Sequence, residues 1–132
     1  MSIAEMIRSH PDVAGSLNEE LAAAVRHAMF CAAICTSCAD ACVAEDDVAE
    51  RRQCIRACLD CADICDATFR VATRQTGDNR AVLRSMLQSC ITACTACAEH
   101  CAMHDDDHCR RCETMCRETI EDCSHALATL GS

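Results

Sequence analysis

Cysteine is the residue type with the greatest capacity for chemistry in this sequence, and its spacing is regular. The 132-residue chain contains 16 cysteines. Three groups share successive steps of four, three and four residues: Cys31, Cys35, Cys38 and Cys42; Cys54, Cys58, Cys61 and Cys65; Cys90, Cys94, Cys97 and Cys101. A fourth group steps by three, four and seven: Cys109, Cys112, Cys116 and Cys123. Thiolates are soft ligands that select copper(I), zinc or iron–sulfur clusters, so this spacing indicates metal binding.

Alternating steps of three and four place side chains on one stripe of an α-helix, the seam that faces its neighbours in a bundle. Each group therefore predicts one helix with four thiols on its buried face. In the fourth helix the missing step falls at Thr119 or Ile120. Packing alone gives no reason for cysteine at nearly every central seam position. Side chains at i and i+4 lie roughly 6 Å apart, which suits two thiolates around one ion better than a disulfide.

Helix-breaking residues are few, and they divide the chain into an arm and a bundle. Residues 1–132 are expected to form a single domain, with an N-terminal arm over residues 1–15 and a bundle over residues 16–131. The four long helices are expected at about residues 16–45, 47–76, 78–104 and 107–130. Short connections make neighbouring helices antiparallel. The predicted fold is therefore all-α, an antiparallel four-helix bundle with a short N-terminal helical arm and a cysteine-lined core.

Polar residues mark the expected helix starts. Ser16 and Glu19 match a capping box, in which each side chain satisfies a free backbone donor. Asp46 and Asp47 are good N-cap candidates for the second long helix, and Asp78 for the third. The acidic residues 105–107 favour the positive end of a fourth helix dipole.

A cysteine content this high usually indicates a secreted disulfide scaffold, but other features oppose that interpretation. Residues 1–11 show no basic region followed by an apolar stretch and a cleavage site, and the apolar runs are too short to span a membrane. Three glycines and one proline are too few for a loop-rich miniprotein. We therefore expect a cytoplasmic protein with reduced thiols. A formal net charge of −9 argues against nucleic acid as a partner.

Charge balance favours copper(I) among the soft metals. Each bound thiolate carries one negative charge, and unneutralised charge in a dry core is very costly. About one copper(I) per thiolate leaves the core near neutral, whereas each Zn(Cys)4 unit keeps a charge of about −2. The alternative is a zinc-thiolate, metallothionein-like buffer, supported by two CxxC pairs with zinc-ribbon spacing that begin at Cys35 and Cys58. Zinc ribbons need knuckle turns, however, and these pairs lie within helical CxxxC frames.

Antiparallel connectivity stacks the cysteines in four predicted layers. In order along the bundle these are Cys42, Cys54, Cys101 and Cys109; Cys38, Cys58, Cys97 and Cys112; Cys35, Cys61, Cys94 and Cys116; and Cys31, Cys65, Cys90 and Cys123. His104, one seam step beyond Cys101, and His108 beside it are predicted extra metal ligands at an entrance for copper. His27, one turn before Cys31, is a candidate ligand at the opposite end. Six apolar residues predict a conventional plug there: Phe30, Phe69, Leu83, Met86, Leu87 and Leu127.

The four interleaved CxxxC and CxxC groups make the chain resemble the bacterial copper storage proteins, over residues 17–130. More specifically, the chain resembles the cytosolic branch of this family, because residues 1–11 show no export signal. The resemblance implies a four-helix bundle, usually a homotetramer, that holds many copper(I) ions through cysteine thiolates. A small thiol or a chaperone is expected to donate and accept the copper. The missing cysteine of the fourth helix leaves the exact capacity open.

An enzyme is not expected. A CxxC thiol–disulfide oxidoreductase places its motif at a helix start that follows a strand. Here only the pair formed by Cys109 and Cys112 lies near a helix start, and no strand is predicted before it. A copper sensor needs few ions and an exchangeable surface site, whereas 16 seam cysteines favour capacity.

Overall fold

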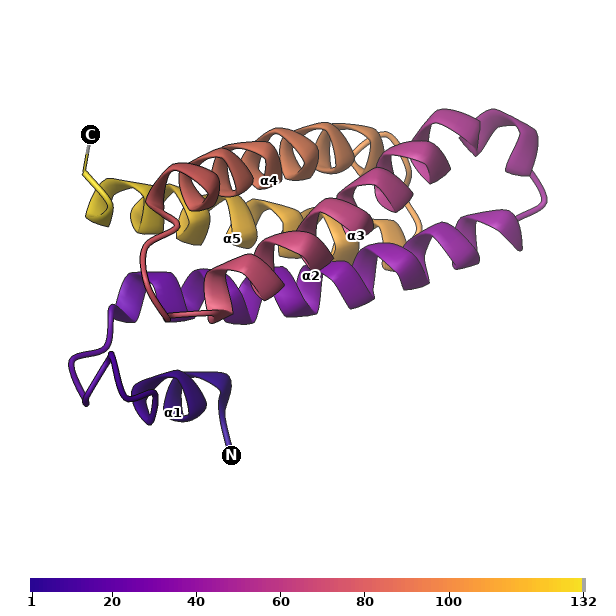
Figure 1. Cartoon of the computed structure of the whole chain (residues 1–132). Coiled ribbons are helices and arrows are strands. Elements are labelled where there is room, and N and C mark those ends of the chain that lie inside the picture. Colours follow the sequence, from indigo (N-terminus) through magenta and orange to yellow (C-terminus); the bar gives the residue numbers. More distant parts are fainter. Residues whose placement is uncertain (132) are drawn as a thin grey trace.

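The computed structural model describes residues 1–131, and the part of the chain it describes is helical (Figure 1). The elements are α1 (Ile3–Arg8), α2 (Glu19–Val43), the short 3-10 helix η1 (Val48–Arg51), α3 (Arg52–Thr73), α4 (Arg80–Cys101) and α5 (Asp107–Thr129). The four long helices are those that the four cysteine groups predict, one group in each helix.

The long helices form an antiparallel bundle in which each helix has two neighbours. Helix α2 packs against α3 and α5, and α4 packs against the same two helices. The α2–α3 and α4–α5 connections lie together at one end, to the right in Figure 1, which we call the loop end. The α3–α4 connection, the start of α2 and the C-terminus lie at the other end, the plug end. The predicted fold class is confirmed.

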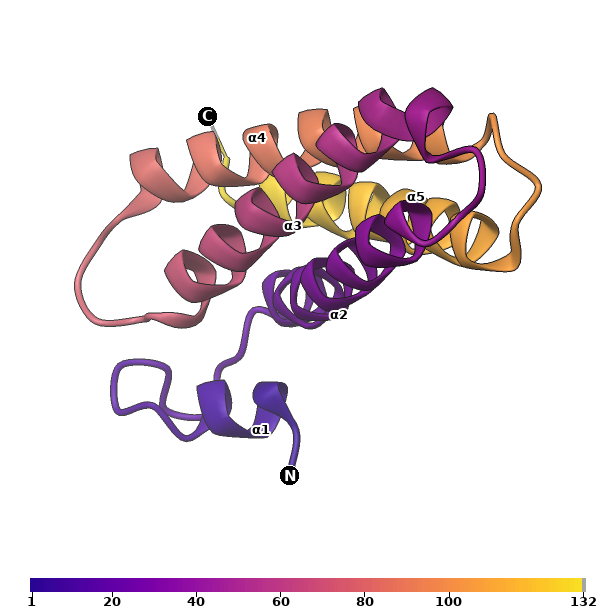
Figure 2. The ribbon, with the colours of Figure 1, turned by 90° about the vertical axis from the view of Figure 1, so that its right-hand side faces the viewer.

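The N-terminal arm packs beneath the start of α2 (Figure 2). Helix α1 begins with a capping box between Ser2 and Glu5, and Ile7 is its buried residue, only 4% exposed. The imidazole Nε2 of His10 lies 3.0 Å from the Thr76 hydroxyl in the α3–α4 connection. The arm is therefore held at the plug end, away from the loops of the opposite end.

The helix starts differ from prediction in their caps. Helix α2 begins at Glu19 with Asn18 as its N-cap, whose side-chain oxygen accepts a hydrogen bond from the Leu21 amide at 3.0 Å. The predicted capping box of Ser16 and Glu19 is wrong, because a turn with Gly15 at a φ of +83° keeps Ser16 outside the helix. Asp47 precedes η1, but its carboxylate binds Arg51 instead of capping the backbone.

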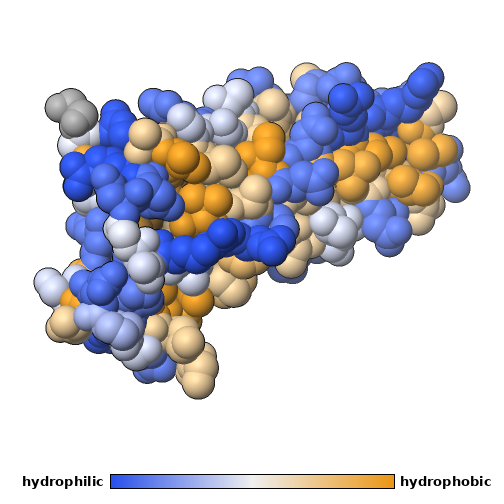
Figure 3. Space-filling view, viewed as in Figure 1, coloured by the Kyte–Doolittle hydropathy of each residue, from blue (hydrophilic) through white to orange (hydrophobic). Residues whose placement is uncertain are grey.

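The bundle core changes in composition along its length. Thiols and alanines fill the middle and the loop end, whereas Val25, Leu83 and Leu87 are buried toward the plug end. Helices α2 and α4 are long and apolar enough to cross a membrane by length and composition, but half of the α2 segment is buried inside the bundle (50%). Burial of this kind is typical of core helices. The face in Figure 3 carries both hydrophilic and hydrophobic residues, with hydrophobic patches near the middle of the bundle and toward the loop end.

Candidate metal centre

All sixteen thiols lie inside the bundle. Each cysteine is at most 2% exposed, and none forms a disulfide. The shortest separations between Sγ atoms of different helices are 3.6 Å, as for Cys65 and Cys90. A disulfide bond would be about 2.05 Å, so these sulfurs are in van der Waals contact. We call this continuous column of sulfur the thiol tube.

The sulfurs gather in overlapping groups of four ligand atoms within 4.8 Å of one another. From the loop end inward, five such groups are Cys38, Cys42, His108 and Cys109; Cys38, Cys58, Cys101 and Cys112; Cys35, Cys97, Cys112 and Cys116; Cys31, Cys35, Cys61 and Cys116; and Cys31, Cys61, Cys65 and Cys94. Each group shares at least one cysteine with the next. Shared sulfurs suit bridging thiolates, in which one sulfur binds two ions.

The groups are staggered, not flat layers as the antiparallel connectivity predicts. The Cys58 sulfur lies 3.6 Å from Cys97, its predicted layer partner, but also 3.8 Å from Cys101 of the layer before. Cys31 likewise contacts Cys94 and Cys116 of the neighbouring layer, at 3.9 and 3.8 Å. Seam side chains of packed helices insert between those of the partner helix, so each sulfur faces the gap between two others.

An imidazole joins the thiols at the loop end. The Nδ1 atom of His108, in the first turn of α5, lies 3.4 Å from the Cys38 sulfur and 3.5 Å from the Cys109 sulfur. Its Nε2 atom lies 2.9 Å from the Glu45 carboxylate. Burial opposes protonation of His108, but its hydrogen bonds to Cys38 and Glu45 outweigh burial and raise the pKa of the imidazole. A carboxylate behind the ring orients the other nitrogen toward a metal.

A buried arginine covers the same end of the tube. Arg51 is 6% exposed, and its Nη1 atom lies 3.8 Å from the sulfurs of both Cys42 and Cys109. Its guanidinium is held by Asp47 and Asp106, each at 2.6 Å. The ion pair with Arg51 lowers the pKa of Asp106 to about 2, and hydrogen bonds to Asp47 and then Asp106 raise the pKa of Arg51. The carboxylates thus fix a cation over the outermost thiols.

Arg51 is a site residue that the cysteine pattern does not predict, although its spacing is a signal in the sequence. It lies three residues before Cys54 and continues the seam of α3 by one step. His104 differs from its predicted place, because α4 ends at Cys101 and leaves His104 half-buried in the loop. It is therefore not a further step of the helical seam, and His108 is the imidazole within hydrogen-bonding distance of the thiols.

The plug end closes the tube with apolar and hydroxyl side chains. Leu87 and Thr119 are fully buried, and Thr68 is 1% exposed. Thr119 occupies the missing step of the fourth group, and its hydroxyl donates a hydrogen bond to the Met115 carbonyl at 2.8 Å. Phe30 is 48% exposed and does not belong to the predicted plug, because it lies beside the seam of α2 instead of on it.

His27 does not extend the tube. Its Nδ1 atom lies 2.5 Å from the Asp122 carboxylate of α5, and its Nε2 atom lies 3.6 Å from Glu118. Both ring nitrogens thus face carboxylates and not sulfur. The role considered for His27 as a ligand at this end has no support from this geometry.

Comparison with known proteins connects this geometry to copper. The sequence profile of a family described as "Copper storage protein" matches residues 17–128. The copper storage protein Ccsp from Streptomyces lividans, in a structure loaded with 10 copper equivalents, is 40% identical. The match covers 96% of this chain and 98% of that chain, with a TM-score of 0.91. The chain belongs to the copper storage protein family.

A second structure, described as copper loading to a cytosolic copper storage protein from Streptomyces lividans with five coppers, is 44% identical. It covers 83% of this chain and 93% of that chain, with a TM-score of 0.81. A comparison with curated protein sequences gave no match. As a member of the copper storage protein family, this chain stores copper, and its clustered cysteines are able to hold several ions.

The two thiols beneath Arg51 in this copper storage protein, Cys42 and Cys109, favour the protonated form. Burial raises the pKa of Cys42 to about 11, although the hydrogen bond from Arg51 pulls in the opposite direction. Burial also raises the pKa of Cys109. At neutral pH an ion that binds these two thiols must therefore displace their protons.

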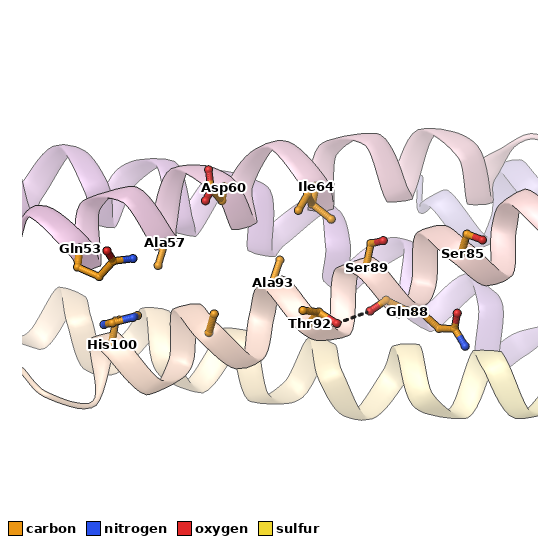
Figure 4. Close-up of a pocket in the computed structure, with 11 residues that line it drawn as sticks. Gln53, Ala57, Asp60, Ile64, Ser85, Gln88, Ser89, Thr92, Ala93 and His100 are labelled. Atoms are coloured by element: carbon orange, nitrogen blue, oxygen red, sulfur yellow. Dashed lines mark hydrogen bonds between the residues drawn. The ribbon is translucent and has the colours of Figure 1, made fainter.

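Two surface grooves of about 610 Å³ flank the bundle of this storage protein. The groove between α3 and α4 is shown in Figure 4, with Asp60 and Ile64 on one wall and Ser89 and Thr92 on the other. Its lining consists of small, polar and aliphatic side chains together with His100. The groove between α2 and α5 is different, because Cys38 and His108 form part of its wall.

Proposed function

We propose that this chain stores copper(I) in the cytosol as polynuclear thiolate clusters, at about one ion per cysteine. The observation that carries the proposal is the sharing of sulfurs between neighbouring groups. Cys38 belongs to the first and second groups, and Cys112 to the second and third. A bridging thiolate serves two ions, so a continuous tube of sulfur is suited to many ions with low coordination numbers. The ligands proposed are the sixteen cysteines and His108, with His104 at the loop beside them.

Zinc is the competing cargo, and the geometry limits it. A mononuclear structural zinc site uses four protein ligands of its own in a tetrahedron. The first, third and fifth groups have no residue in common, so zinc could occupy those three at once only by leaving the intervening groups incomplete. Each all-thiolate zinc site also keeps a charge of about −2 in a dry core. Copper(I), at one charge per thiolate, avoids that repulsion.

We propose that copper enters and leaves at the loop end. His108 contacts both Cys38 and Cys109 and is partly exposed, so it can accept an ion and pass it to sulfur. Imidazole is an acceptable copper ligand. An imidazole near the surface releases a bound ion more readily than a buried thiolate does. His104 lies in the adjoining loop and is proposed as an auxiliary ligand there. The donor is a small thiol or a chaperone. The role is storage, and we propose no catalytic activity.

Anaerobic titration followed by metal analysis tests this function. The reduced protein receives copper(I) in one series and zinc(II) in a second, and the bound metal is counted per chain after gel filtration. We expect more than about ten copper(I) ions, approaching one per thiol. A variant with Cys35 and Cys112 changed to alanine should bind fewer, with an exposed Ser124→Ala variant as the matched control. Binding of four divalent ions with negligible copper(I) uptake would contradict copper storage and favour zinc.

We also propose a homotetramer, the assembly that the family resemblance implies. Several large apolar side chains are exposed on the single chain, among them Phe30 at 48% and Val82 at 56%. Light scattering on the apo and loaded protein should give a mass near four times the 14.3 kDa of one chain. A mass equal to that of one chain would contradict the tetramer while leaving the storage function intact.

A further inference from the structure

The outer thiols can be approached from two directions, and one of them is obstructed. Along the bundle axis, the guanidinium of Arg51 lies over Cys42 and Cys109 and is anchored by two carboxylates. Moving it would separate both ion pairs. From the side, the groove between α2 and α5 reaches Cys38 and His108 directly. The structure therefore favours the lateral approach to the first ligands.

We propose that the groove between α2 and α5 binds an anionic copper(I) complex of a small thiol and delivers its ion to Cys38 and His108. This inference rests on the proposed function, copper(I) storage. It adds the place where the donor docks and the chemical class of that donor. A volume of about 610 Å³ is within the range of about 300–1,000 Å³ that is usual for small-molecule sites.

Charge on the groove selects an anion. Arg110 and Arg111 belong to its lining, in a chain whose formal net charge is −9. The one acidic residue of the lining, Glu118, lies 3.6 Å from the imidazole of His27. The Nε atom of Arg111 donates to Asp107 at 2.8 Å, and Arg110 donates to the Asp105 carbonyl. These bonds orient the two guanidinium groups and use few of the five N–H donors that each carries. The remaining donors suit carboxylates and thiolates of a bound complex.

The other groove provides an internal comparison. It has the same volume and is also lined by two neighbouring helices. Its lining contains neither a cysteine nor an arginine, and its acidic residue is Asp60. An anionic copper complex would find there no cation to bind and no sulfur to receive the ion. The two grooves thus have the same volume and similar helical walls. They differ in the arginines and the cysteine that the proposed docking requires.

The delivery step is a ligand exchange without change of oxidation state. A copper(I) bis-thiolate complex of charge −1 first meets Cys38 in the groove wall. Cys109, whose sulfur lies 4.0 Å from that of Cys38, is the second receiving thiol. Each protein thiol gives its proton to a leaving donor thiolate as its sulfur bonds to copper. Two neutral donor thiols leave, and the copper(I) bis-thiolate on the protein carries the same charge of −1. His108, 3.4 Å from the Cys38 sulfur, is placed to hold the ion while the thiolates exchange.

Bulky substitutions at the groove rim test the docking site. Ser37 and Thr114 line this groove and are exposed, so Ser37→Trp and Thr114→Trp should fill it without disturbing the core. Ser89→Trp, in the comparison groove, is the matched control. Stopped flow measures the rate of loading from the copper(I)–glutathione complex. This rate should fall about tenfold in the first two variants and stay unchanged in the control. Circular dichroism and equilibrium copper capacity should match the wild type.

The charge requirement is tested with Arg110→Gln/Arg111→Gln and three probes. We expect slower loading from anionic copper(I)–glutathione, an effect that weakens as salt is added. Loading from the cationic copper(I)–cysteamine complex or from acetonitrile-solvated copper(I) should not slow. Wild-type rates in Ser37→Trp and Thr114→Trp, equal slowing in Ser89→Trp, or equal slowing with all three probes would overturn the proposal. The proposed function fails separately, if the wild-type protein binds no copper(I) at equilibrium.

Discussion

The two ends of the thiol tube are built from different chemistry. At the loop end, Arg51 and His108 contact sulfur and are each backed by carboxylates. At the plug end, Leu87 and Val25 are fully buried beyond the last shared sulfurs. Polar side chains can exchange ligands with an incoming ion and apolar side chains cannot. The loop end is therefore suited to the entry and exit of copper ions. The plug end buries apolar surface and thereby stabilises the fold. The thiol-rich middle contributes less, because a buried thiol is only weakly hydrophobic.

Removal of an apolar side chain from the plug end should have the largest effect on stability. Leu87→Ala is expected to lower the free energy of unfolding of the apo protein by about 2–5 kcal/mol. Urea unfolding in reductant and chelator measures the change. Val82→Ala, exposed on the same helix, is the control and should change stability little. Equal losses in both variants would mean that the plug is not the stabilising region of the apo bundle.

Alkaline pH should affect the thiol tube and spare the plug. Burial raises the pKa of Cys42 to about 11 and also raises that of Cys109. A thiol whose folded pKa lies above its unfolded value of 9.0 contributes stability that is complete below pH 9. That contribution is lost as pH rises through the folded value. The apo melting temperature should therefore fall between about pH 9 and 11, whereas the copper-loaded protein, already deprotonated at sulfur, should change much less. A flat apo profile would contradict buried neutral thiols.

Exchange kinetics should separate the loop end from the middle of the tube. Replacement of His104 and His108 by alanine should change the rates of copper loading and removal, while capacity falls by no more than about two ions. Replacement of Cys38 and Cys58 by alanine should instead lower capacity. Stopped-flow loading and metal analysis on both variants provide the comparison. Unchanged rates in the histidine variant would remove the evidence for an entrance at the loop end.

The smallest effect should come from completing the fourth cysteine group. Thr119 is fully buried at the missing step, so Thr119→Cys should extend the shared sulfurs toward Cys123 and raise capacity by about one ion. Ser124→Cys, on the exposed face of α5, is the control and should not add a buried site. Metal analysis at saturation distinguishes the two. No gain in the Thr119 variant would show that capacity is set by something other than the number of buried sulfurs.

Much of the fold could be predicted because one residue type marks every buried seam. Steps of three and four between cysteines specify both the helices and the face that each buries. The staggering of the sulfur groups could not be predicted, because sequence spacing fixes the order along a helix and not the axial offset between helices. The Ser16 cap failed for a similar reason, since the turn at Gly15 decides where α2 begins.

The loop end shows where reading the site from one residue type falls short. Arg51 continues the α3 seam before Cys54, but a charged residue is rarely buried unless it is paired. Its partners, Asp47 and Asp106, come from two different connections, and only the folded chain brings them together. The place of His108 beside the outermost cysteines predicts it as a ligand, whereas its contact with Cys38 of α2 depends on the packing of α5 against α2.

Anomalous scattering from crystals loaded with about one copper(I) per chain tests the difference between the two ends most directly. Copper(I) should appear first among Cys38, Cys42, Cys109 and His108, the group that combines thiols with an exchangeable imidazole. At saturation it should extend inward through the shared sulfurs to Cys65 and Cys94. First occupancy at Cys90 and Cys123, beside the buried leucines, would contradict the assignment of the loop end as the route for copper.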